Sequence, residues 1–186
     1  MSKTVNFCGD SFCESLDENS WTVQLTQQLN YKMIGRGKLG SAHEHAIQSF
    51  NPSADLTIFC WTEPHRLYHK THRLNMSSCD ALRDQNPVYE AGYQYYKYIH
   101  DAEHMIQRQK RDFYWFDRNV LSHYSGTCIH LWCYQKTYHW RKGETVLQSS
   151  LSSYAQRFSG SINHFNEQFN AQLSKRIYQY LRSLNG

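Results

Sequence analysis

A serine directly follows a short β-like run near the amino terminus. Residues 4–8 favour a strand, and this run ends abruptly at Gly9, Asp10 and Ser11. One interpretation is a strand-to-helix turn that Asp10 or Ser11 caps. The other is a nucleophile, because a serine hydroxyl at the end of a strand can attack a carbonyl carbon when a base lies within reach. The rest of the chain has to supply that base and the donors that stabilise the oxyanion.

Three later segments offer such groups. A glycine-containing turn spans residues 35–41, a polar segment spans 61–66, and residues 160–166 lead into the last helical pattern. His164 is the candidate base, although a polar residue at a helix start is the blander interpretation. The N–H of Gly40 is a candidate oxyanion donor, unless this glycine only permits a tight turn with a positive φ.

The spacing of apolar residues indicates which elements position these segments. Four short, almost continuously apolar runs are expected to be parallel strands covered on both faces, over residues 4–8, 31–35, 55–61 and 128–134. Helical periodicity separates these runs, over residues 21–29, 43–50, 91–106, 113–124 and 165–181. Residues 67–86 have no period and are expected to form a surface loop.

Alternating strands and helices predict βαβ units and therefore a parallel sheet. We expect one domain, residues 1–186, with a three-layer α/β/α fold. Ligands of such sheets bind beyond the carboxyl ends of the strands, where Ser11 and residues 61–66 emerge.

The order and spacing of these segments resemble the SGNH (GDSL-type) hydrolases, which are esterases and lipases with a flavodoxin-like parallel sheet. The resemblance runs from Gly9 to the terminal helix, and the block Gly9-Asp10-Ser11 is a close match. It implies that Ser11 is the nucleophile and that its backbone N–H donates to the oxyanion. The second block of the family would place another donor at Gly40, and the last block would make His164 the base.

Two positions depart from the family pattern. Where the third block usually supplies an asparagine to the oxyanion hole, this chain has Thr62, for which a strand-end hydroxyl with local bonds is the simpler interpretation. Where the last block usually has an aspartate, three residues before the histidine, this chain has Ser161. Because the loss of one oxyanion donor costs about 100- to 1000-fold in turnover, we expect modest catalysis.

Four residues are further candidates for substrate contact or for support of the site, namely Asp10, Glu63, Arg66 and Ser161. Arg66 could bind an anionic group of the substrate, although an exposed position without a role is the simpler expectation for Glu63 and Arg66.

The predicted function is hydrolysis of a small acyl ester, such as an O-acetyl group on a carbohydrate, with neither a cofactor nor a metal. The alternative is a non-catalytic binding or structural protein on the same fold, such as a viral or bacterial accessory protein. His65, His69 and His72 have spacings that a helix would bring to one side, but no committed set of metal ligands surrounds them.

Composition limits the class of protein. The 186 residues are 40% hydrophobic and 19% charged, as in globular domains, and the dispersed net charge of +4 does not favour nucleic-acid binding. No apolar run approaches the roughly 20 residues of a membrane span.

The amino terminus does not resemble a signal peptide, so a cytoplasmic protein is expected, with virion association as the other location. The six cysteines form no C-x-x-C pair and are expected to be reduced.

Overall fold

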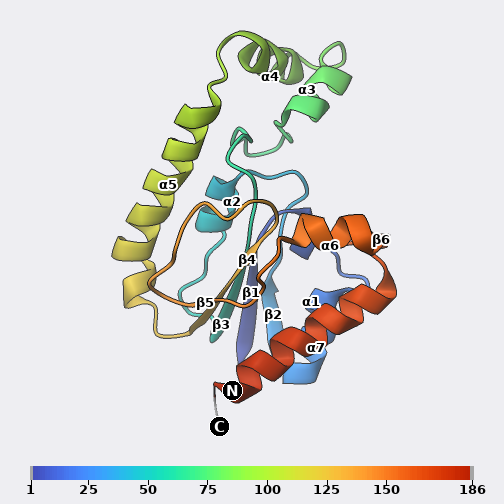
Figure 1. Cartoon of the computed structure of the whole chain (residues 1–186), viewed down its shortest axis with the longest axis vertical. Helices are drawn as coiled ribbons and strands as arrows, with labels where there is room; N and C mark the ends of the chain where they lie inside the picture. The colour runs from blue at the N-terminus through green and yellow to red at the C-terminus, as the bar shows by residue number, and fades with distance from the viewer. Residues whose placement is uncertain (1, 185–186) are drawn as a thin grey trace.

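A parallel sheet forms the centre of the computed structural model, which describes residues 2–184 (Figure 1). Within these residues five strands form the sheet in the order β2-β1-β3-β4-β5, and every pair is parallel. The strands are β1 (Thr4–Gly9), β2 (Lys32–Gly35), β3 (Leu56–Trp61), β4 (Thr127–Trp132) and β5 (Glu144–Thr145). The predicted parallel sheet is confirmed, and β5 is an addition that the sequence did not indicate.

The strand order places a switch point between β1 and β3. The chain moves from β1 outward to β2 and then returns to β3 on the other side of β1. Loops that leave the carboxyl ends of such neighbouring strands diverge and open a crevice, where doubly wound sheets bind their ligands. Ser11 follows β1 and Thr62 follows β3, so both residues border this crevice.

Helices cover both faces of the sheet (Figure 1). On one face, Phe7 and Ile58 pack in a core with α1 (Trp21–Leu29) and α7 (Glu167–Ser183). On the other face, the core residues come from β1, β3 and β4, from α2 (His43–Gln48) and from α5 (Ala102–Asn119). Burial on both faces explains why the strands are continuously apolar. The mixed α/β architecture agrees with the expected layers of helices, sheet and helices.

The expected helix over residues 91–106 is wrong. The structure has α4 (Pro87–Tyr98) and then α5, with a break between them. The Asp101 carboxylate accepts a hydrogen bond of 2.7 Å from the His104 N–H, and this cap starts a new helix. The expected helix over residues 113–124 is the second half of α5 followed by a 3-10 turn, Leu121–His123.

The segment 67–86 is not only a loop, which corrects the expectation from its lack of period. It contains α3 (Met76–Leu82), capped by Asn75, which pairs with α4 in a helical hairpin that projects beyond the sheet (Figure 1). The sequence also did not indicate α6 (Leu151–Arg157) or β6 (Ser159–Ile162). None of the helices within residues 2–184 combines the length and the apolar character that a bilayer crossing requires.

Candidate active site

The nucleophile candidate stands on a tight turn at the carboxyl end of β1. A Cβ atom at Gly9 would lie 2.4 Å from the Cys60 carbonyl oxygen, so only glycine lets β1 approach β3 this closely before the turn. The buried Asp10 carboxylate then accepts a hydrogen bond of 3.1 Å from the Phe12 N–H and caps a 3-10 helix, Ser11–Cys13. Ser11 is the first residue of that helix, where backbone N–H groups have no partner within the helix.

The candidate base stands on a strained turn between β6 and α7. Asn163 and His164 both adopt positive φ values, 51° and 71°, which residues other than glycine rarely adopt. The Asn163 side chain holds this turn, because its Oδ1 accepts a hydrogen bond of 2.8 Å from the Ser15 N–H. Backbone strain of this kind is retained where the surrounding structure enforces it, and it is frequent at functional sites.

The two turns bring Ser11 and His164 into contact across 153 residues of sequence. Ser11 Oγ and His164 Nε2 lie 2.6 Å apart, within the range expected of a nucleophile and its general base. The Phe12 ring lies against the imidazole, with the ring centroids 4.6 Å apart and the planes inclined by 42°. A hydroxyl and an imidazole in this arrangement can exchange a proton.

The other nitrogen of His164 has no carboxylate partner within residues 2–184. Ser161, three residues before His164, is exposed in β6 and makes no hydrogen bond to His164 in this part of the chain. The imidazole is therefore oriented by the Phe12 ring and by the backbone of its own turn.

The Gly40 turn packs directly on the nucleophile turn. Lys38 N–H and Ser41 Oγ both donate to the Gly9 carbonyl oxygen, at 2.9 and 3.1 Å. Gly40 has a φ of 67°, and a Cβ atom there would lie 2.8 Å from the Arg73 side chain. The positive φ is by itself a sufficient reason for a glycine at position 40. The packing places the turn beside Ser11, at the carboxyl end of the strands.

Thr62 does not have the local hydrogen bonds that we expected. Only 3% of the residue is accessible, and its Oγ1 has no hydrogen-bond partner among the described residues. A buried hydroxyl that stays unpaired costs about 1–3 kcal/mol. Its backbone carbonyl is paired, with Gln109 Nε2 at 3.0 Å.

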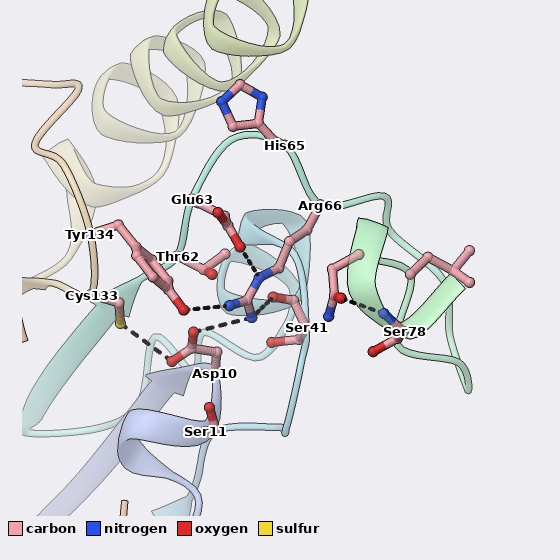
Figure 2. A network of polar contacts seen from close by, with 12 residues as sticks. Asp10, Ser11, Ser41, Thr62, Glu63, His65, Arg66, Ser78, Cys133 and Tyr134 are labelled. Atoms are coloured by element: carbon pink, nitrogen blue, oxygen red, sulfur yellow. Dashed lines mark hydrogen bonds and ion pairs between the residues drawn. The ribbon is translucent and has the colours of Figure 1, made fainter. Parts of the chain in front are cut away.

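The Arg66 side chain is buried, which corrects the expectation of an exposed position. Only 5% of the residue is accessible. Its guanidinium lies at the centre of a polar network beside the nucleophile turn (Figure 2). It donates to Glu63 Oε1 (3.0 Å), Asp10 Oδ2 (3.2 Å), the Ser41 carbonyl oxygen (3.2 Å) and the Tyr134 hydroxyl (3.0 Å). The expectation of an exposed Arg66 was wrong because the four acceptors lie in separate segments of the chain, which only the folded structure brings together.

The charge of Arg66 is maintained in this buried place. Burial by itself would lower the pKa of the guanidinium, but the Asp10, Tyr134 and Glu63 groups together raise that pKa above its ordinary value. Burial also raises the pKa of the Tyr134 hydroxyl, which stays protonated at neutral pH. The network is thus a buried, satisfied ion pair of Asp10 and Arg66, with Glu63 half-buried at its edge.

Sequence reasoning missed three contributors to the site. Phe12 packs on His164, Tyr134 accepts from Arg66, and the Cys133 thiol donates to Asp10 Oδ1 at 3.3 Å. Tyr134 and Cys133 follow β4, so the end of the run 128–134 was an available signal, because that strand neighbours β3. Burial raises the pKa of Cys133, and the six cysteines are free thiols within the described residues.

The histidines that were considered for a metal do not converge. The His65 ring packs on His100, whereas His69 and His72 pack on each other. His43, Glu44 and Asp112 lie close enough to hold one cation. Arg108 and Arg111 already pair with those carboxylates, at 3.2 and 3.5 Å.

A cavity of about 670 Å³ lies at the end of the sheet where the strands begin, against Lys3, Asp55 and Thr127. These residues stand at the amino ends of β1, β3 and β4, so the cavity is remote from the Ser11 turn.

Comparison with known proteins adds no relative, since no protein-family model, no curated protein and no solved structure matches the chain.

Proposed function

We propose that the chain is a serine ester hydrolase of the SGNH type, built on a flavodoxin-like sheet. The observation that carries this proposal is the 2.6 Å contact between Ser11 Oγ and His164 Nε2. The strand order 2-1-3-4-5 and the place of Ser11 at the switch point support it. So does the strained backbone of Asn163 and His164, which projects the imidazole toward the serine.

In the proposed reaction, His164 Nε2 takes the hydroxyl proton while Ser11 Oγ attacks the ester carbonyl. The tetrahedral intermediate collapses to an acyl-enzyme, and His164 returns the proton to the departing alcohol. A water molecule, deprotonated by His164 in the same way, then attacks the acyl carbon and releases Ser11.

The negative charge of the intermediate would be stabilised by the N–H of Ser11 at the start of its 3-10 helix and by the N–H of Gly40. The hydroxyl of Thr62, the third expected donor, is unpaired among the described residues but buried, so it could reach the oxyanion only if the surrounding side chains moved. A carboxylate behind the base is worth about 10,000-fold in enzymes built around one. Since His164 is oriented by Phe12 instead, we expect modest turnover of a small activated acyl ester, with an O-acetylated carbohydrate as the natural type of substrate.

The second candidate is a binding protein that keeps the fold without turnover. The lack of a carboxylate partner for His164 within residues 2–184 favours it. Both candidates predict the same fold, and they differ in the reactivity of Ser11.

Labelling with a fluorophosphonate probe separates the two candidates. We expect the wild-type protein to be labelled at one site, and Ser11→Ala and His164→Ala to abolish labelling. Ser77→Ala, which removes an exposed hydroxyl in α3, is the matched control and should be labelled as the wild type. An unlabelled wild-type protein, under conditions that label a known serine esterase, would exclude the hydrolase.

A further inference from the structure

We propose that Arg66 is a positioning residue that sets the distance between the nucleophile turn and the oxyanion turn. This inference rests on the proposed function for its catalytic consequence, and on geometry alone for its structural part. One atom, Arg66 Nη1, donates both to Asp10 Oδ2 and to the Ser41 carbonyl oxygen, each at 3.2 Å. Asp10 immediately precedes Ser11, and Ser41 immediately follows Gly40.

The same guanidinium is fixed from its other side. Nε donates to Glu63 and Nη2 donates to the Tyr134 hydroxyl, while the Tyr134 ring lies 5.5 Å from the guanidinium carbon. Figure 2 shows the planar group enclosed by these partners above the nucleophile turn. Because a guanidinium donates in fixed directions, anchoring two of its nitrogens fixes where the third one points.

The bridge adds a side-chain link between two turns that three other hydrogen bonds already join. Asp10 caps the 3-10 helix that carries Ser11, so a shift of the Asp10 carboxylate moves the nucleophile and its N–H. Ser41 ends the turn whose glycine supplies the second N–H. The Gly40 turn has no regular secondary structure. Lys38 and Ser41 donate to Gly9 and Gly37 donates to Cys13, while Arg66 supplies the link between Ser41 and Asp10.

Arg66→Lys is the test. Lysine keeps the charge, but a single ammonium group cannot donate in the fixed fork that reaches Asp10, Ser41, Glu63 and Tyr134 together. We expect the rate of fluorophosphonate labelling to fall about 100-fold, as for a displacement of about 1 Å at a reacting group. The final extent of labelling should remain one per protein. A merely destabilised protein would label more slowly only in proportion to its folded fraction, which urea unfolding measures.

Amide hydrogen exchange supplies a readout that does not need catalysis. The N–H groups of Gly37, Lys38 and Ser41 donate to Cys13, Gly9 and Lys38, and they report how firmly the turn is held. In Arg66→Lys we expect these amides to exchange about 10-fold faster, with the strands β3 and β4 unchanged. Arg83→Lys, which alters an ion pair with Asp80 in α3, is the matched control and should change neither measurement.

Tyr134→Phe covers the case in which Arg66→Lys fails to fold, because it removes one hydrogen bond to the guanidinium and keeps the ring. It should accelerate exchange of the same amides by a smaller factor. Unchanged exchange of these amides in the variant that folds would overturn the positioning role. If the wild type is not labelled but exchange responds as expected, the hydrolase proposal fails and the bridge between the two turns stands.

Discussion

The Phe12 ring packs against the His164 imidazole, with centroids 4.6 Å apart, and no carboxylate of the described residues pairs with this imidazole. An aromatic ring fixes the plane of a neighbouring imidazole by contact, but it cannot stabilise an imidazolium as a carboxylate does. In the proposed site, Phe12 therefore fixes the orientation of the His164 ring, but no carboxylate of the described residues stabilises its protonated form.

Phe12→Leu should separate orientation from stability. Leucine keeps most of the apolar volume, so the free energy of unfolding should fall by only about 1.5 kcal/mol. The labelling rate should fall about 10-fold because the imidazole gains freedom to turn away from Ser11. Phe169→Leu, in the same core but in α7, is the control. Equal effects of both substitutions on labelling would contradict an orienting role of Phe12.

Ser161→Asp should increase activity. It restores a carboxylate three residues before His164, on an exposed position of β6 where the charge is not desolvated. A carboxylate that reaches the free ring nitrogen would hold the productive tautomer and stabilise the imidazolium, and we expect about a 10-fold faster hydrolysis of p-nitrophenyl acetate. Ser153→Asp, at an exposed position of α6, controls for added charge. An unchanged rate would show that residue 161 does not face the base.

Gly40→Ala should reduce the labelling rate of Ser11 more than it reduces the stability of the protein. A side chain at φ 67° costs about 1–2 kcal/mol, and Arg73 would have to move away from the new Cβ. The labelling rate should fall by at least about 10-fold, since the Gly40 N–H shifts with its turn. Gly143→Ala imposes a similar strain at φ 89°, beside β4, and should destabilise without slowing labelling. Parallel losses of labelling in both variants would remove Gly40 from the oxyanion site.

The buried His130 should make the protein less stable in acid. Burial lowers its pKa from 6.5 to about 3, and its neutral form is satisfied, since Nδ1 accepts from Trp61 Nε1 and Nε2 donates to the Lys142 carbonyl oxygen. Below pH 6.5 the unfolded chain binds a proton at this histidine and the folded chain does not. Stability is therefore lost as the pH falls, by about 1.4 kcal/mol per pH unit from this group, until the pH approaches the folded pKa.

Urea unfolding at pH 7 and pH 5 measures this effect. His130→Gln removes the titrating group, so the difference in unfolding free energy between the two pH values should shrink by about 2 kcal/mol relative to the wild type. His123→Gln, which changes an exposed histidine, should leave that difference as it is. An unaltered difference in His130→Gln would mean that other groups account for the acid sensitivity.

Local sequence signals predicted the strands better than the helices near the projecting hairpin. The runs at β1, β3 and β4 are apolar because both faces are covered, which leaves a pattern in the sequence itself. The helices α4 and α5 share one apolar period across their break, so the pattern continued over Asp101, and the cap that divides them is a single side chain. The apolar period indicates which face of a helix is buried, but it does not show where one helix ends and the chain turns into the next.

The sequence by itself determined the parallel strands and the segments that carry Ser11, Gly40 and His164, because burial and turn chemistry act on neighbours in the chain. Only the tertiary structure decided that Ser11 and His164 touch, that Thr62 is left unpaired among the described residues, and that Arg66 is buried. The partners of Arg66 come from the ends of β1 and β3, from the Gly40 turn and from the segment after β4. Whether a long charged side chain points into solvent or into such a network depends on acceptors that are distant in sequence, and only folding brings them together.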